Sequence, residues 1–168
     1  PDGIVHFAGH GVVKRYGNAA RYVMKLGDAE LDVDTLRGLH GGGGRFPFFF
    51  FNACELGQAD STLGTFVDGW APAVLERGGS GFVGALWPVD DASATTFSAG
   101  FYKRLEAQLD LVGEARVADL LKATRRELEG NGDPTFLSYV YYGDPEFRFT
   151  RGSAKPKRRE LKSFGAPE

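Results

Sequence analysis

Sulfur is scarce in this sequence: its 168 residues contain one cysteine, Cys54, and one methionine. A single cysteine excludes a disulfide within the chain and is typical of a reducing compartment, so we expect a cytoplasmic protein. The sequence also lacks any run near the roughly 18 consecutive apolar residues of a membrane-spanning helix, and it has no charged-then-apolar leader. No membrane association is therefore expected. The chain begins at Pro1 without a methionine, as a fragment or a processed piece would.

A strong charge of one sign is also lacking, because the formal net charge is only −2. The charge is nevertheless uneven: residues 148–168 carry seven basic groups against two acidic ones, which leaves −7 on the other 147 residues. A nucleic-acid-binding domain would be basic over a whole face, so nucleic acid is not an expected partner. The segment Lys157-Arg158-Arg159 could contact phosphate or an acidic partner, but a solvated terminus is the simpler interpretation.

Apolar residues make up 42% of the chain and aromatic residues 13%, which suits one compact domain of this length. The strongest strand signal is the run from Phe46 to Phe51, whose unbroken apolarity is typical of a parallel strand covered on both faces. A flexible loop is expected at the four glycines 41–44. Strands are predicted at 3–8, 22–26, 46–51, 80–86, 136–142 and 147–149, and helices at 35–39, 65–76, 92–108 and 114–129. This alternation predicts an α/β domain with a mainly parallel sheet flanked by helices.

Three predicted strands run into residues with unusual chemistry. One ends in Gly-His-Gly at 9–11, another in Asn-Ala-Cys-Glu at 52–55, and a third in Trp-Pro-Val-Asp-Asp at 87–91. Functional residues gather at the carboxyl ends of parallel strands. We therefore expect His10, Cys54 and the two aspartates to meet at one edge of the sheet.

The histidine and the cysteine together suggest nucleophilic catalysis. A cysteine nucleophile needs a base within hydrogen-bonding reach and N–H donors for the oxyanion of a tetrahedral intermediate. Histidine in general titrates in the range of such a base, which makes His10 the candidate, and Gly11 could offer its backbone N–H beside that of Cys54. Each residue also has a structural interpretation, since a lone cysteine is commonly a small buried side chain and a histidine between glycines is often a turn residue. Their convergence favours catalysis.

Four blocks of the sequence, taken in order, resemble the successive motifs of CHAT domains. They are His-Phe-Ala-Gly-His-Gly at 6–11, Asn-Ala-Cys-Glu at 52–55, Gly-Ala-Leu-Trp-Pro-Val-Asp-Asp at 84–91 and Tyr-Gly-Asp-Pro at 142–145. CHAT domains are caspase-like cysteine peptidases, related to caspases, separase and gingipains, that are often fused to tetratricopeptide repeats. One block alone would carry little weight, but four in order make the resemblance fairly specific.

The resemblance implies a caspase-like three-layer sandwich over residues 1–150, followed by a basic tail at 151–168. It implies a bacterial cysteine endopeptidase in which His10 is the general base, Cys54 is the nucleophile, and the N–H groups of Gly11 and Cys54 bind the oxyanion. The partners it implies are a protein or peptide substrate and an upstream region or activator that controls the enzyme. The alternative is a caspase-like scaffold that no longer cleaves, although a scaffold needs neither His10 nor Cys54.

The chain departs from the family pattern at two places. Caspase-like folds have another strand and helix before the histidine strand, and Pro1 leaves no room for them, so more protein is expected upstream. Some relatives with basic specificity carry an acid two residues before the cysteine, where this chain has Asn52. The remaining acidic candidates for a substrate pocket are Asp90 and Asp91, with Trp87 as a wall. Their simpler roles are a helix N-cap, above all for Asp91, and ordinary packing for the tryptophan.

No cofactor or metal site is predicted. The tetraglycine lacks the Gly-Lys-Ser/Thr ending of a phosphate-binding loop. Asp32 and Asp34 are explained by a turn into a short helix that Asp34 would cap, and one cysteine with scattered histidines does not make a zinc site. His6 is expected to be hydrogen-bonded within the sheet packing, and His40 to be solvated.

Overall fold

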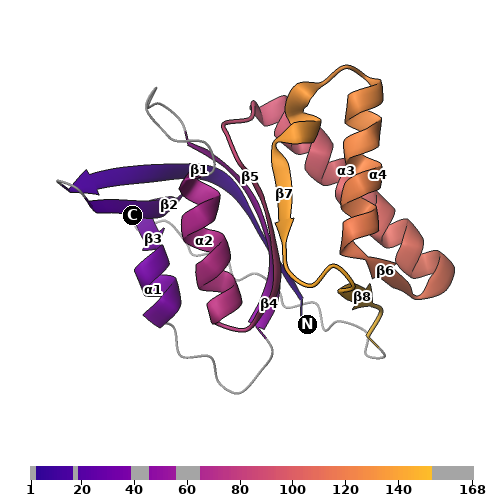
Figure 1. The fold of residues 1–168 in the computed structure, drawn as a ribbon, viewed down its shortest axis with the longest axis horizontal. Coiled ribbons are helices and arrows are strands. Elements are labelled where there is room, and N and C mark those ends of the chain that lie inside the picture. Colours follow the sequence, from indigo (N-terminus) through magenta and orange to yellow (C-terminus); the bar gives the residue numbers. More distant parts are fainter. Residues whose placement is uncertain (1–2, 17–18, 39–45, 56–64, 153–168) are drawn as a thin grey trace, which may run out of the picture.

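The computed structural model describes residues 3–16, 19–38, 46–55 and 65–152 (Figure 1). The predictions for His40, for the tetraglycine and for the basic segment after residue 152 lie outside these residues. Along the chain the elements are β1 (Ile4–Tyr16), β2 (Ala19–Leu26), β3 (Ala29–Asp32), α1 (Val33–Gly38), β4 (Phe46–Glu55), α2 (Thr65–Glu76), β5 (Gly79–Ala85), α3 (Asp91–Val112), β6 (Glu114–Arg116), α4 (Val117–Gly130), the 3-10 helix η1 (Pro134–Leu137), β7 (Tyr139–Tyr142) and β8 (Arg148–Thr150).

A six-stranded sheet forms the middle layer, in the order β3-β2-β1-β4-β5-β7. Its centre is parallel, because β4 runs parallel to both β1 and β5. The antiparallel strands β2 and β3 continue the sheet on one side, and β7 closes it on the other. Helices α1 and α2 cover one face, while α3 and α4 cover the other (Figure 1). This arrangement confirms the expected caspase-like α/β sandwich.

The phenylalanines of β4 explain why both faces are covered. Phe49 and Phe51 pack into a core with Trp70 of α2, whereas Phe48 and Phe50 pack into a second core with aromatic residues of α3. None of the four phenylalanine side chains is more than 7% exposed. The unbroken apolar run therefore has the cause that the sequence predicted, since successive side chains enter opposite cores.

The first strand is longer than predicted. Strand β1 continues through the Gly-His-Gly block to Tyr16, because residues 11–16 pair with β2 in an antiparallel hairpin. The block therefore lies inside a strand and not at its end. Pairing with a later segment is a long-range effect that the local pattern of residues 3–8 did not reveal.

Other boundaries also moved because of tertiary pairing. Residues Glu114–Arg116 form β6 against β8, so α4 starts only at Val117 and not at 114. The start of the strand predicted at 136–142 is instead the 3-10 helix η1, whose cap Asp133 accepts a hydrogen bond from the backbone of Thr135 at 2.9 Å.

Two predictions about single polar side chains were wrong. Asp32, and not Asp34, caps α1, because its carboxylate accepts the backbone N–H of Thr35 at 2.6 Å. Within the described residues His6 has no hydrogen bond; its ring instead packs against Phe50 and Tyr102, with centroid distances of 5.1 and 5.4 Å. Burial lowers the pKa of His6, as expected for an imidazole beside aromatic rings.

Candidate active site

The parallel pairing of β1 with β4 brings His10 and Cys54 together. The two strands are in register from Ile4 opposite Phe48 onward, and within this ladder His10 is the direct partner of Cys54. Neighbouring strands lie about 4.7–4.9 Å apart, so the two backbones are separated by one strand spacing. Residues 44 positions apart in the sequence are therefore adjacent at the carboxyl end of β4.

Asn52, two residues before Cys54, lies on the face of the sheet that α3 and α4 cover. Strand residues alternate between faces, so every second residue of β4 shares one side. Phe48 and Phe50 pack in the core on that side, and Asn52 makes a hydrogen bond to α3. Cys54 follows Asn52 by two residues in β4, and His10 is its register partner in β1.

Asn52 joins the end of β4 to two other elements. Its Nδ2 donates to the carbonyl of Ala94, in the first turn of α3, at 3.1 Å, and its Oδ1 accepts from the hydroxyl of Tyr139, in β7, at 2.6 Å. The ring of Tyr139 is fully buried and stacks on Phe97 with a centroid distance of 3.7 Å and an interplanar angle of 5°. Asn52 thus connects the strand segment before Cys54 to α3 and to β7, the strand at the edge of the sheet.

Little in the sequence indicates this contact. In the sequence, Asn52 is notable only as the position where some relatives have an acid, and no motif includes Tyr139. The two residues are 87 positions apart. The only available signal was that a buried tyrosine in a strand needs a partner for its hydroxyl group.

The third sequence block surrounds the start of α3. Trp87 is half-buried shortly after β5, and Asp91 is the exposed first residue of the helix. Asp90 is the N-cap, because its carboxylate accepts the backbone N–H of Ser93 at 3.0 Å. Hydrogen bonds from Ser93 lower the pKa of Asp90. The capping role therefore belongs to Asp90 and not to Asp91, for which the sequence favoured it.

Gly11 lies within the sheet, at a buried position of β1. It is flanked by Glu55 of β4 on one side and by Met24 of β2 on the other. The first block thus contributes a histidine and a glycine from the middle of a strand, both next to the end of β4.

A family model for the CHAT domain matches residues 2–144, which span the three blocks described above and most of the fourth. The chain belongs to the CHAT-domain family. This family is caspase-like, in agreement with the parallel sheet centre and the helices on both of its faces. No curated protein matches the chain. In the described part of this CHAT domain, none of the helices has the length and apolarity needed to span a membrane.

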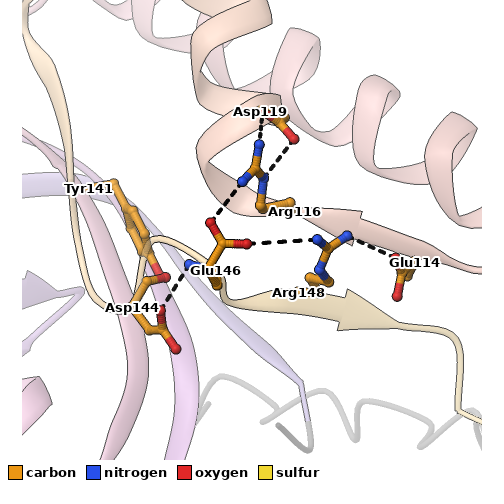
Figure 2. Close-up of polar contacts among 7 residues, drawn as sticks. All are labelled: Glu114, Arg116, Asp119, Tyr141, Asp144, Glu146 and Arg148. Atoms are coloured by element: carbon orange, nitrogen blue, oxygen red, sulfur yellow. Dashed lines mark hydrogen bonds and ion pairs between the residues drawn. The ribbon is translucent and has the colours of Figure 1, made fainter.

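The last block of the CHAT domain, residues 142–145, starts at the last residue of β7 and continues into the turn after it (Figure 2). The hydroxyl of Tyr141 donates to the carbonyl of Asp144 at 2.8 Å, and the Asp144 carboxylate accepts the N–H of Glu146 at 2.9 Å. Gly143 has a φ of +155°, and a Cβ there would lie 2.8 Å from Cζ of Tyr141. Burial raises the pKa of Tyr141 to about 12, which keeps its hydroxyl protonated as the donor. The block is thus built for a tight turn.

A chain of ion pairs fixes this turn to the neighbouring helix (Figure 2). Arg116 contacts Glu146 at 2.8 Å and holds Asp119 of α4 through two nitrogens at 2.8 and 2.9 Å. Arg148 contacts Glu114 at 2.8 Å and Glu146 at 3.8 Å. Exposed ion pairs contribute little individually, so the importance of this network is that it connects four segments of the CHAT domain.

Proposed function

We propose that this CHAT domain is a cysteine endopeptidase that cleaves peptide bonds of a protein or peptide substrate through a His10–Cys54 dyad. The observation that carries the proposal is the register pairing of these two residues on β1 and β4. A base and a nucleophile on adjacent strands are within one strand spacing, as general-base activation of a thiol requires. Membership of a caspase-like family supports the same reaction class.

In the proposed reaction, His10 takes the proton of the Cys54 thiol as the sulfur attacks the scissile carbonyl carbon. The C–S bond forms, and the carbonyl π electrons move onto oxygen to give a tetrahedral oxyanion. Collapse of this intermediate breaks the C–N bond, and His10 gives the proton to the leaving amine. Water then attacks the thioester with His10 again as base, which releases the acid and restores the thiol.

Four further residues are proposed to complete the site. The backbone N–H groups of Gly11 and Cys54 would bind the oxyanion. Trp87, Asp90 and Asp91 would line the pocket for the substrate side chain, and the contact between Ala94 of α3 and β4 supports this by bringing the start of the helix to the end of the nucleophile's strand.

The proposed setting follows from the chemistry of the thiol. A reactive thiolate survives best in a reducing cytoplasm, and the resemblance to CHAT peptidases supports a bacterial source. A peptidase in such a compartment needs restraint, so we include control by an upstream region or by an activator protein in the proposal.

The first prediction concerns the dyad. Cys54→Ala and His10→Ala in the full-length protein should each abolish turnover of a peptide library, with a loss of about a hundredfold or more, because each removes a reacting group. Cys54 is the only cysteine, so a thiol-directed peptide probe reports on this residue alone. Mass spectrometry of the labelled protein, with and without candidate activators, gives the measurement.

The matched control is His6→Phe, on the same strand. It replaces an imidazole that packs against aromatic rings and should leave labelling unchanged. Cleavage that survives in Cys54→Ala would refute the mechanism. Folded protein that is never labelled, under any condition, would instead favour the non-cleaving scaffold.

A further inference from the structure

We propose that Asn52 and Tyr139 form a positioning pair that holds Cys54 beside His10. This inference rests on the proposed function, because it concerns the same dyad. Asn52 is two residues before Cys54 in β4 and donates a hydrogen bond to α3. The hydrogen bonds of Asn52 therefore limit the movement of the last residues of β4.

The contact spans the strand that lies between the two residues. Phe51 pairs with Gly84 of β5, so the next step of the parallel register sets Asn52 level with Ala85. Ala85 in turn pairs with Tyr139 of β7. Its methyl group lies in the same core as the tyrosine ring, and this small side chain leaves the phenol free to pass over β5 and reach Asn52.

The two hydrogen bonds determine the orientation of the Asn52 amide. The Ala94 carbonyl can only accept, so the NH2 group of the amide must face it. The amide oxygen then faces Tyr139, whose hydroxyl must be the donor. An aspartate at position 52 would put two acceptor oxygens against each other at α3, so the contact requires the amide and not the acid.

Tyr139 is a rigid anchor for this contact. Its side chain is fully buried, and its ring stacks face to face on Phe97 of α3. A buried hydroxyl without a hydrogen-bond partner would cost free energy. The bond to Asn52 gives the hydroxyl of Tyr139 a partner. The pair therefore joins β4, β7 and α3 at one point, two residues before the nucleophile.

The same aromatic layer provides a matched control. Tyr102 of α3 packs against Phe50, as Tyr139 does. Its hydroxyl is buried but has no hydrogen-bond partner in the described part of the chain. Tyr102→Phe thus removes a buried tyrosine hydroxyl without touching Asn52.

The second prediction uses the single thiol. The rate of Cys54 alkylation by iodoacetamide is measured against pH in full-length protein for Asn52→Ala, Asn52→Asp, Tyr139→Phe and Tyr102→Phe. A thiol next to a histidine has a lowered pKa, and loss of alignment should raise it toward the usual value of about 8.5. We expect the thiol pKa to rise in Asn52→Ala and Tyr139→Phe, to rise further in Asn52→Asp because of the added negative charge, and to stay at the wild-type value in Tyr102→Phe.

Turnover should be reduced in the same variants whose thiol pKa rises. Tyr139→Phe should lower kcat about tenfold with KM within about twofold, because a small misplacement of the nucleophile affects the chemical step. The double variant Asn52→Ala/Tyr139→Phe should have the same kcat as Asn52→Ala alone, since both changes break the same contact between Asn52 and Tyr139. Melting temperatures verify that every variant is folded.

The possible failures are distinguishable. If His10→Ala raises the thiol pKa while Tyr139→Phe and Asn52→Ala leave it unchanged, the positioning pair is refuted and the dyad stands. If His10→Ala also leaves the thiol pKa unchanged, the dyad itself is refuted.

Discussion

At the scale of single residues, glycines allow β5 to lie close to its neighbours because they have no side chain. A Cβ on Gly79 would lie 2.7 Å from the backbone oxygen of Val74 in α2, and a Cβ on Gly81 would lie 2.8 Å from the ring of Phe48. The first obstacle is backbone, which cannot turn away as a flexible side chain can. The start of β5 can therefore enter between α2 and β4 only as glycine.

The third prediction follows from this close approach. Gly79→Ala should lower the free energy of unfolding by about 1–3 kcal/mol, the usual cost of overpacking a filled interior. Gly130→Ala is the matched control. Gly130 is the last residue of α4, and a Cβ added there would have no other atom within 4 Å. That change should be neutral or slightly stabilising, since alanine restricts the unfolded chain. Urea denaturation measures both, and equal stabilities of the two variants would contradict the packing argument.

At the scale of elements, α3 has well-defined ends. Asp90 caps its start, and Gly113 ends it with a φ of +79° and an N–H bonded to the carbonyl of Leu109 at 3.1 Å. This helix carries Ala94, the acceptor of the Asn52 amide, in its first turn. The N-cap therefore stabilises the part of α3 that contacts the end of β4.

The fourth prediction concerns this cap. Asp90→Ala should lower the Tm by about 2–4 °C, the usual effect of a lost cap in a chain of this size, and Asp91→Ala should lower it less. Hydrogen bonds from Ser93 lower the pKa of Asp90 below its ordinary value of 3.8. The folded state thus favours the carboxylate, so its contribution is present at neutral pH and is lost as the pH falls through the lowered pKa.

Thermal melts of both variants from pH 7 to pH 2 test this directly. The difference between wild type and Asp90→Ala should shrink in the most acidic samples. A larger loss in Asp91→Ala would mean that the cap is assigned to the wrong aspartate.

Elements determined by local pattern could be predicted, and those determined by distant pairing could not. The run from Phe46 to Phe51 shows its burial on both faces in its own composition. Glu114–Arg116 is a strand only because β8 returns beside it, and the hairpin half of β1 needs β2. The candidate site shows the same difference: His10 and Cys54 are predicted from local sequence blocks and family motifs, whereas the contact between Asn52 and Tyr139 depends on folding across β5.

At the scale of the whole molecule, one sheet separates two cores. Trp70 belongs to the core under α1 and α2, and Phe101 belongs to the core under α3 and α4 (Figure 1). The side chains of β4 enter both cores alternately, so neither layer can separate without exposing phenylalanines of the shared strand. We infer that the two layers unfold together.

The fifth prediction tests this coupling with Phe101→Leu in a Trp87→Phe background, where Trp70 is the only tryptophan left. Phe101 is fully buried, and its loss should cost about 1–3 kcal/mol. Although the change lies on the far side of the sheet from Trp70, the fluorescence midpoint should fall as much as the midpoint from circular dichroism, because a two-state domain has one transition. Leu111→Ala, at a position 77% exposed near the end of the same helix, should move neither midpoint. A fluorescence midpoint that stays in place while the dichroism midpoint falls would show that the layers unfold independently, and the alternating phenylalanines of β4 would then not couple them.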